Sequence, residues 1–513
     1  MKFTQIALLF ALGSAATVQA ETFTVTRFDD PLPGACAVGD CSLREAAMAA
    51  DDNDRFGPTD LITLSAGSYT LVRGELPLHQ NLIVQGAGSS LTHVSTDARL
   101  LLGHDLSLDL RGLSARTSDF GLVAIGNNGT LALDDVATPV DAGIVQVFAT
   151  ESDFFVRNSD LRDGVGCNQK NGTCSIIDSQ LSSLYVNPSD GPGPTVLLRG
   201  SVLDGALDVA NSLTGMVLHQ AARVEIVDST ITRTKVGLKD FHDPLIVRVR
   251  RLTYAENAAP MSFGRNGTLQ NPADVEIIDS VFSSNTSRAI RAAGQSTMVI
   301  RGSSFLSNKV DDETGGAIVV EDSASMHVGN STFSGNTFTI AAGQDGARGG
   351  AIGYRNGTGA EVDVQHVTIV RPVGVPIGVL GNAIGGYGGT GEVVVNISNT
   401  ILAGTCGFDV GALHHAFGNI ESPGNSCTFT GSSNQNNVSA ANLAIGSLAD
   451  HGGPTPTFVP ADSSVAVDAA SQDQCLALDQ RGYVRPAGDV DAVCDSGAVE
   501  VGGEQPIFTD GFE

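Results

Sequence analysis

A short pattern of alternating apolar and polar residues recurs through the middle of the chain. Each copy has apolar residues at every second position, then a polar pair, then a further apolar step. Clear copies cover residues 224–231, 275–282, 298–305 and 326–333, and weaker copies cover residues 154–161, 362–369 and 394–401. An alternation with a period of two predicts strands with one buried face. Strands this short cannot bury a face alone, so we expect each copy to pack against the next.

The spacing of the copies selects the architecture. Their closing residues, Phe282, Phe305, Phe333, Ile369 and Ile401, are 23, 28, 36 and 32 residues apart. A spacing in the low twenties fits one coil of a parallel β-helix, and larger gaps fit the same coil with a loop inserted. Propeller blades need about 40 to 50 residues, and a period of two argues against helical repeats. We therefore predict an all-β fold, a parallel β-helix (solenoid) whose inward Phe and Ile side chains form one continuous apolar column.

Two recurring motifs occupy the predicted corners. The form F-x-x-N occurs at residues 282–285, 305–308 and 333–336, and the form G-G-A-I occurs at residues 315–318 and 349–352. Phe would stack on its equivalents, and Asn tolerates the left-handed conformation and can hydrogen-bond to Asn in adjacent coils. The glycines permit a positive φ, and the Ile enters the core.

These paired motifs resemble the repeats of the polymorphic outer membrane protein family, over about residues 280–401. The resemblance implies a right-handed β-helix that is exposed on a bacterial surface, with adhesion as an expected role.

The N-terminus predicts export. Lys2 precedes a short apolar stretch at residues 6–12, and Val18-Gln19-Ala20 offers small residues for cleavage. This pattern is typical of a secretory signal peptide, which we assign to residues 1–20. We expect an extracellular protein or one associated with the outer-membrane surface.

Residues 21–90 are expected to form the N-terminal cap and the first coils. Residues 22–26 alternate as a strand, and Ser42 with Glu45 forms a capping box that should start a helix. The helix would place Leu43, Ala46, Ala47 and Ala50 on one face, which can lie across the open end of the solenoid. The segment is similar to the CSLREA domain, whose six-residue string stands at residues 41–46. That resemblance implies an exported bacterial protein and no particular reaction.

The β-helix repeats are assigned to residues 91–398, and residues 399–502 are expected to form a loop-rich C-terminal cap. The cap resembles the choice-of-anchor Q domain in residues 399–402, 448–455, 479–482 and 494–500. Its Arg481, Arg485, Asp495 and Glu500 are candidates for catalysis, but we expect them to pair with one another and hold the loops together. Residues 503–513, which include the string IFTDGFE, form a tail of unknown role.

Eight cysteines fit an oxidising compartment. They permit 105 connectivities, and short loops favour pairing of sequence neighbours. A zinc site is the alternative, but only one pair has a suitable spacing. We predict the disulfides Cys36–Cys41, Cys167–Cys174, Cys406–Cys427 and Cys475–Cys494.

Charge and composition narrow the partners. The 513 residues carry a formal charge of −27, which argues against nucleic acid as a partner because phosphates would be repelled. The hydrophobic fraction of 42% argues against a disordered chain. No stretch after the signal peptide has the apolar length of a transmembrane helix. We expect a monomer whose ligand is a surface glycan or a protein.

A basic cluster is the best candidate for surface chemistry. It comprises Arg233, Lys235, Lys239, Arg248, Arg250 and Arg251. Arg248 and Arg250 lie two residues apart, so they share one strand face. With Lys239 they are the candidate catalytic groups of a polysaccharide lyase, which must neutralise a uronate carboxylate. The alternative is a solvated face that balances local acid.

No metal site or cofactor is predicted. If an ion binds, Ca²⁺ suits the carboxylates of Asp240 and Asp243, or those of the loop at residues 311–313. The adjacent His414 and His415 point to opposite faces of a strand, so they do not form a metal-binding pair.

Two functions follow from these observations. The first is an exported β-helical protein with an adhesive or envelope-structural role and no catalytic activity. The alternative is a lyase that acts on an acidic polysaccharide through the basic cluster at residues 233–251.

Overall fold

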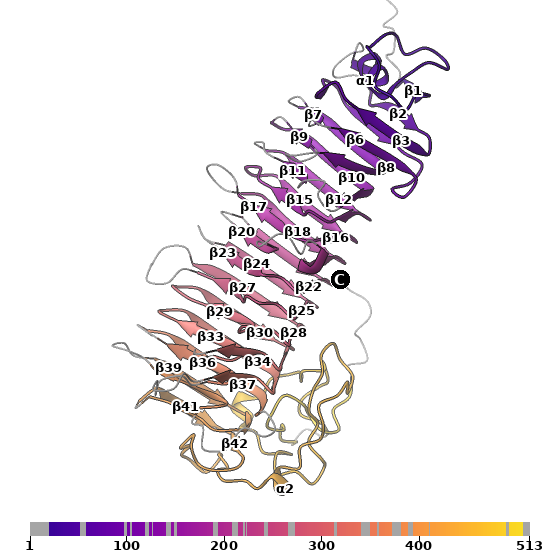
Figure 1. The fold of residues 1–513 in the computed structure, drawn as a ribbon. Helices are drawn as coiled ribbons and strands as arrows, with labels where there is room; N and C mark the ends of the chain where they lie inside the picture. Colours follow the sequence, from indigo (N-terminus) through magenta and orange to yellow (C-terminus); the bar gives the residue numbers. More distant parts are fainter. Residues whose placement is uncertain are drawn as a thin grey trace, which may run out of the picture.

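The protein is a rod of stacked coils (Figure 1). The computed structural model describes residues 20–51, 58–96, 100–102, 105–117, 123–125, 127–139, 145–147, 151–187, 193–207, 214–218, 221, 223–240, 245–264, 272–311, 315–339, 349–355, 359–371, 381–387, 393–409, 411–488 and 492–505. The predicted signal peptide, apart from Ala20, and the IFTDGFE part of the tail lie outside these residues. Strands of successive coils pair in parallel, and one chain segment runs around each coil from one face to the next. The fold is a right-handed parallel β-helix, as predicted.

Each coil has three strand-bearing faces, which we call the first, second and third face. The first face comprises β1 (Thr22–Val25), β2 (Asp60–Leu64), β5 (Leu82–Gln85), the N-terminal part of β8 (Ser107–Thr117) and of β10 (Thr130–Thr138), β12 (Asp153–Arg157), β15 (Thr173–Ile177), β18 (Thr195–Arg199), β21 (Arg223–Val227), β24 (Leu245–Arg250), β27 (Ala273–Ile278), β30 (Thr297–Arg301), the N-terminal part of β34 (Ser325–Ser334) and of β37 (Glu361–Val370), β39 (Val394–Ser398) and β41 (Leu413–Phe417).

The second face follows the first around a corner. It comprises β3 (Gly67–Leu71), β6 (Thr92–Thr96), the C-terminal parts of β8, β10, β34 and β37, and the strands β13 (Asp160–Leu161), β16 (Gln180–Leu181), β19 (Val202–Asp204), β22 (Thr230–Thr232), β25 (Thr253–Ala255), β28 (Val281–Ser283), β31 (Ser304–Leu306), β40 (Ile401–Ala403) and β42 (Ile420–Glu421).

The third face closes the coil. It comprises β4 (Leu76–Leu78), β7 (Leu100–Leu102), β9 (Val123–Ile125), β11 (Val145–Val147), β14 (Val165–Cys167), β17 (Leu184–Val186), β20 (Gly215–Leu218), β23 (Val236–Asp240), β26 (Met261–Phe263), β29 (Ile290–Ala292), β33 (Ile318–Glu321), β36 (Ile352–Arg355) and β38 (Ile384–Tyr387). Outside these faces, β32 (Lys309–Asp311) pairs with β35 (Thr337–Thr339), and the described helices are α1 (Leu43–Asp51), α2 (Ala440–Leu443), η1 (Gly205–Leu207) and η2 (Gln472–Gln474).

The predicted column of Phe side chains is present, but the prediction that Ile401 continues it is wrong: Ile369 pairs with Leu402, and Ile401 lies in a separate apolar cluster. Phe282 stacks on Phe305 with ring centroids 4.8 Å apart, and Phe305 stacks on Phe333 at 4.6 Å. All three side chains are fully buried. Tyr254 extends the column in the preceding coil, 5.8 Å from Phe282. In-register pairing of β25, β28, β31 and β34 sets this alignment.

Buried polar side chains form continuous ladders at the corners. Asn285 Nδ2 donates to Asn308 Oδ1 at 2.7 Å, and Asn308 Nδ2 donates to Asn336 Oδ1 at 2.9 Å. A serine ladder lies at the corner between the first and second faces, where the backbone N–H of Ser280 donates to Ser303 Oγ and that of Ser303 donates to Ser331 Oγ. Each ladder satisfies buried groups in one coil with groups from the next.

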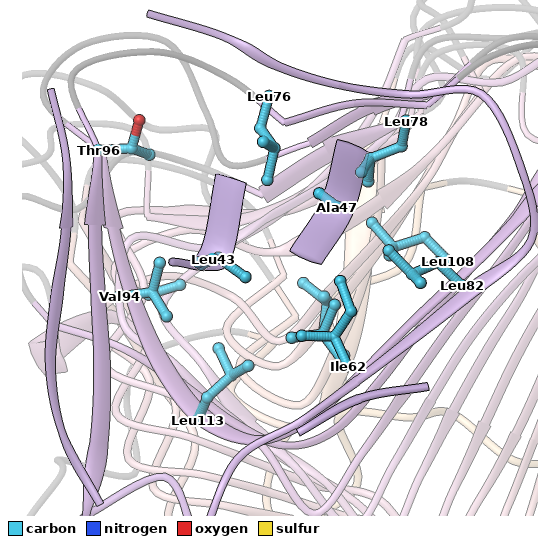
Figure 2. A pocket seen from close by; sticks show the side chains of 13 residues that line it. Leu43, Ala47, Ile62, Leu76, Leu78, Leu82, Val94, Thr96, Leu108 and Leu113 are labelled. Atoms are coloured by element: carbon cyan, nitrogen blue, oxygen red, sulfur yellow. The ribbon is translucent and has the colours of Figure 1, made fainter. Parts of the chain in front are cut away.

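The N-terminal helix seals the apolar column, as its sequence indicates. Glu45 Oε2 accepts from the backbone N–H of Ser42 at 2.8 Å, and Ser42 Oγ accepts from that of Glu45 at 3.3 Å, so the capping box is formed. Leu43 and Ala47 of α1 face a cavity of about 30 Å³ lined mainly by apolar side chains of the first coils (Figure 2). The burial of Arg44 was not predicted; its guanidinium donates to both carboxylate oxygens of Asp30.

The C-terminal segment, which we define as residues 422–488 and 492–505 after the last strand, extends beyond the end of the rod. It folds back along the second face, alongside β31, β34 and β37 (Figure 1). Gln480 is the central contact: its Nε2 donates to Ser304 Oγ at 3.0 Å and its Oε1 accepts from Thr332 Oγ1 at 2.6 Å. The backbone N–H of Ala498 donates to Thr368 Oγ1 at 2.9 Å. This return along the side of the rod was not predicted.

The four predicted disulfides are formed: Cys36–Cys41, Cys167–Cys174, Cys406–Cys427 and Cys475–Cys494. Among the described residues, no helix has the length and apolar character needed to cross a membrane.

Candidate functional site

The predicted basic cluster is divided between faces. Arg248 and Arg250 lie on β24 of the first face and alternate with buried residues, so both point outward. Lys239 lies on β23 of the third face. The fold therefore brings Arg248 and Arg250 together and leaves Lys239 on another sheet. Of the two predicted Ca²⁺ regions, Asp243 and residues 312–314 lie outside the described residues.

Most described arginines of the cluster are paired with acid. Arg248 binds Asp274 at 2.8 Å, Arg251 binds Asp228, and Arg233 binds Asp204. Arg250 differs, because it is exposed and makes no hydrogen bond or ion pair in the described part of the chain. The cluster as predicted is therefore largely a set of separate pairs.

A groove lies further along the same face, towards the C-terminal end. Its volume is about 450 Å³, within the range of pockets that hold small ligands. It is lined by His327, Asp363, Val364, Gln365, Asn396, Ile397, Ser398, His415, Phe417 and Gln474. Most of these come from four consecutive strands of the first face, and Gln474 comes from the C-terminal segment.

Strand register builds the groove. His327 pairs with Asp363, Asp363 with Asn396, and Asn396 with His415, across β34, β37, β39 and β41. In β34, β37 and β39 these residues alternate with buried apolar ones, so their side chains project from one outward row. Residues separated by up to 88 positions thus become neighbours at single-strand spacing.

The polar groups of the groove are held in position. Asn396 Nδ2 donates to Asp363 Oδ1 at 2.6 Å, while Asn396 Oδ1 is buried without a hydrogen-bond partner. Burial lowers the pKa of His327; Asp363 opposes this effect and Arg301 adds to it. His327 is therefore neutral at pH 7, with a ring that can both donate and accept hydrogen bonds.

An aromatic surface forms one end of the groove. The rings of His415 and Phe417 are stacked, with centroids 6.2 Å apart and planes inclined by 19°. Phe417 is 45% exposed, so its ring is accessible to a ligand. An exposed apolar ring beside convergent polar groups is typical of a binding site.

The C-terminal segment supplies the opposite wall. Gln365 Nε2 donates to the backbone carbonyl of Gln474 at 2.8 Å, and Asn399 Nδ2 donates to the same carbonyl at 2.9 Å. The next residue, Cys475, is joined to Cys494. The wall is therefore tied both to the rod and to the rest of the segment.

Sequence reasoning missed the groove. His415 was considered only as half of an adjacent histidine pair, and His327, Asp363 and Asn396 were not considered. The sequence copies do not align these residues, because Asn396 is one step out of phase in its copy and His415 lies outside the copies; strand pairing alone brings them into one row. Among described residues, no group of three His, Cys, Asp or Glu side chains could hold a metal ion.

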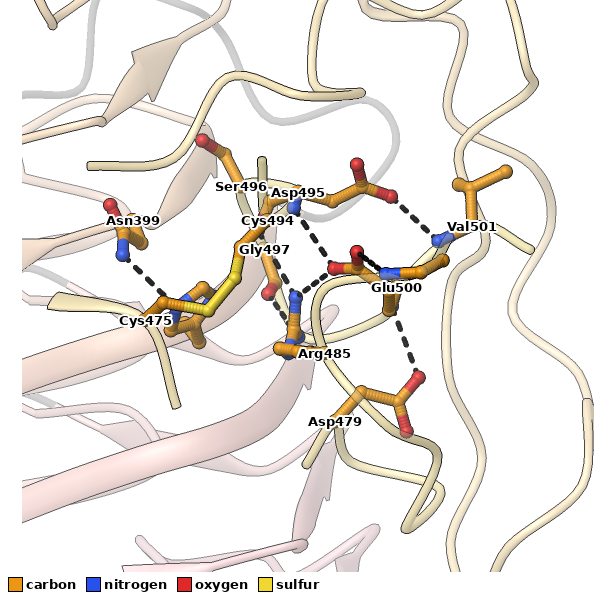
Figure 3. Close-up of polar contacts among 12 residues, drawn as sticks. Asn399, Cys475, Asp479, Arg485, Cys494, Asp495, Ser496, Gly497, Glu500 and Val501 are labelled. Atoms are coloured by element: carbon orange, nitrogen blue, oxygen red, sulfur yellow. Dashed lines mark hydrogen bonds and ion pairs between the residues drawn. A yellow bond between two sulfur atoms is a disulfide. The ribbon is translucent and has the colours of Figure 1, made fainter. Parts of the chain in front are cut away.

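The candidate catalytic groups of the C-terminal segment form a structural network (Figure 3). Arg485 is fully buried; its Nη1 lies 3.0 Å from Glu500 Oε2, and its Nη2 donates to the carbonyl of Gly497 at 2.8 Å. Both Asp495 carboxylate oxygens accept backbone N–H groups, and burial raises the pKa of Asp495 to about 6. Arg481 pairs with Asp479 at 2.7 Å. These groups are engaged with one another and with the backbone, and they join the loops of the segment.

Comparison with known proteins supports the fold. Residues 163–369 match a family model described as a right handed beta helix region. No curated protein matches the chain.

Similar solved structures are distant. The A-module of the Azotobacter vinelandii mannuronan C-5 epimerase AlgE6 has 15% identity and a TM-score of 0.32, over 75% of this chain and 96% of that chain. The catalytic domain of a GH87 alpha-1,3-glucanase in complex with nigerose has 12% identity and a TM-score of 0.28, over 74% of this chain and 67% of that chain. Similarity at this level does not identify a function.

Proposed function

We propose that the protein is an exported β-helical surface protein that binds a glycan in the groove of the first face, in an adhesive or envelope role. The observation that carries the proposal is the exposed Phe417–His415 surface beside the Asp363–Asn396 pair. A sugar ring has one apolar face, which stacks on an aromatic ring, and hydroxyls that bind carboxylates and amides. The Asp363 carboxylate and the Asn396 amide provide such groups in the groove.

Export is supported by the four disulfides, which persist in oxidising compartments. It is also supported by the predicted signal peptide. Cleavage before Glu21 and release from cells would be read by N-terminal sequencing of the protein from the medium or the outer surface.

Binding without turnover is preferred to the lyase alternative. A lyase through residues 233–251 would use Arg248, Arg250 and Lys239 together, whereas Lys239 is on another face and Arg248 is paired with Asp274. Turnover of alginate or pectate, measured as absorbance of unsaturated products and abolished by Arg250→Ala, would instead establish the lyase.

The test is binding to a panel of immobilised glycans. Phe417→Ala should lower affinity for the bound glycan by about tenfold or more, because the stacking surface is lost. Leu91→Ala removes another exposed apolar side chain, 52% accessible, at the opposite end of the rod, and should have no effect. Equal affinity of the wild type and Phe417→Ala, or no binding to any glycan, would reject the proposal.

A further inference from the structure

A regular row of arginines runs along the first face. Arg157, Arg199, Arg250 and Arg301 are the last residues of β12, β18, β24 and β30, and all are exposed. We call them the arginine row. Strand pairing puts one intervening strand between each arginine and the next, and its residue in the row is apolar: Ile177, Val227 and Ile278.

The spacing of the row is set by the backbone. Paired strands lie about 4.8 Å apart, so successive arginines recur at about 9.6 Å and the four span about 29 Å. In the same register the row continues through Gly329, Gln365 and Ser398 to Phe417. Gln365, Ser398 and Phe417 line the groove, so the arginine row leads directly into it.

The guanidinium groups of the arginine row have open hydrogen-bond donors. None makes a hydrogen bond or an ion pair within the described residues, in contrast with Arg248 and Arg251 one or two positions away. An exposed arginine with open donors can bind a carboxylate through two parallel hydrogen bonds. The row therefore offers a line of vacant anion sites.

Aspartates alternate with the arginines. Asp178, Asp228 and Asp279 follow the apolar residues of the intervening strands, at corners with a positive φ. These carboxylates place negative charge between successive arginines. They would repel a polymer that carries an anionic group at every strand spacing. Nucleic acid has closely spaced phosphates and would be repelled. A polymer with one anionic group per two strand spacings meets the arginines alone.

We propose that the arginine row binds an extended acidic polysaccharide whose chain enters the groove. The inference rests on the proposed glycan-binding function and names the class of glycan. An extended 1,4-linked chain advances by roughly one strand spacing per sugar ring, and a two-fold twist turns alternate carboxylates to the same side. Those carboxylates would recur at about the spacing of the arginines. The long, flexible arginine side chains can adjust to the remaining difference between the two spacings.

A structural role for the row makes a different prediction. The hydrogen bond from Arg251 is the main cause that lowers the pKa of Asp228, and Arg199 adds to it. Burial raises the pKa of Asp279, and Arg251 and Arg250 oppose that rise. Arg199 and Arg250 therefore also contribute to balancing the corner charges. If balance were their only role, substitution would lower the melting temperature and leave ligand binding unchanged.

The experiment uses the mature chain and size-defined oligomers of 1,4-linked uronate. Controls are the same oligomers with carboxylates reduced to alcohols, and single-stranded DNA as a densely charged polyanion. Affinity for oligouronate should rise in steps of two sugars. Arg199→Gln and Arg250→Gln should each lower it about tenfold, since a charge-assisted contact is lost. Each should also lower the slope of log affinity against log salt by about 1.

Arg223→Gln is the matched control, because Arg223 is exposed on β21 of the same face but pairs with Glu225 at 2.7 Å. It should leave affinity unchanged. Three results would each reject the proposal for the arginine row. They are equal binding of oligouronate and reduced oligomer, unchanged affinity in the row variants, and tighter binding of DNA than of oligouronate. If Phe417→Ala then still weakened binding of the reduced oligomer, the proposed glycan groove would stand without the row. If neither oligomer bound, the proposal for the arginine row would be rejected, and the glycan panel would decide the proposed groove.

Discussion

The two terminal parts of the chain attach to the rod by different chemistry. At the N-terminal end, Leu43 and Ala47 of α1 cover the apolar interior of the first coils. At the other end, the C-terminal segment covers an outward face, where it meets the hydroxyls of Ser304, Thr332 and Thr368. A lid over the interior can rely on apolar contact, whereas a lid on the outward face must pair every polar group that it buries. The C-terminal attachment should therefore depend more strongly on charge and pH.

The largest effect is expected at the buried Arg485–Glu500 pair. Arg485→Met leaves the Glu500 carboxylate buried without its cation and should destabilise the C-terminal segment by about 3–5 kcal/mol. Limited proteolysis should show cleavage of the segment before the coils unfold. Adding Glu500→Gln should recover part of the loss. Arg27→Gln at the N-terminal end removes the exposed pairs with Asp29 and Asp40 and should change stability much less than Arg485→Met does.

The corresponding N-terminal substitution is Leu43→Ala. It enlarges an existing apolar cavity and should cost about 2–4 kcal/mol. Urea unfolding would measure the loss, and its size should be the same at pH 7 and pH 5, because the contact contains no titrating group. A loss that depended on pH would contradict the distinction between the two ends.

A smaller effect is expected from acid at the C-terminal contact. His366 lies against this segment, and burial lowers its pKa to about 3, with Arg485 adding to the shift. The neutral form is favoured in the folded state, so stability is complete above about pH 6.5 and is lost as the pH falls toward 3. Asp495 has the opposite sign, since its pKa is raised to about 6: its contribution is complete below pH 3.8 and is lost as the pH rises through 6.

The two contributions largely cancel between pH 6 and 3.8, so His366 acts without opposition from Asp495 between pH 7 and 6, where His327, whose pKa is also lowered by burial, adds an effect of the same sign. His366→Asn should remove the His366 share of this slope in melting temperature and leave the His327 share. Asn is a suitable replacement, because Asn330 and Asn399 occupy the equivalent corner of the neighbouring coils with φ of 45° and 51°. An unchanged slope in the variant would show that His366 is not the titrating group.

The smallest effect is expected at the helix cap. Ser42→Ala removes one member of the capping box and should cost about 1 kcal/mol. Hydrogen exchange should report faster opening of α1 alone. Faster exchange in the C-terminal segment as well would mean that the two ends are coupled.

Local repetition made the coils predictable. Phe282, Phe305 and Phe333, the Asn corners and the capping box each have a short sequence signature that fixes its own neighbours. The return of the C-terminal segment has no such signature, because Gln480 contacts Ser304 across 176 positions and loops carry no period. Knowledge of the β-helix alone does not say which outward face a terminal segment will cover.

Prediction of the groove and of the arginine row requires the strand register as well as the sequence repeat. His327, Asp363 and His415 come from coils of unequal length, so their alignment is visible only after the strands are paired. The arginine row has a simpler signal: the strand ends alternate between Arg and a β-branched residue followed by Asp, as in Arg199, Val227-Asp228 and Arg250. Comparison of single copies does not reveal the arginine row, because its repeat spans two copies.

The serine ladder has a consequence for how the length of this molecule can change. Excising residues 280–302 would join Asp279 to Ser303 and restore the sequence order of corner residue, serine and inward Phe. Leu252 would then meet Ser303 where it now meets Ser280, and Tyr254 would face Phe305 in place of Phe282. Loss of this coil would therefore preserve these interior contacts, so the molecule can become one coil shorter at this point without a redesigned core.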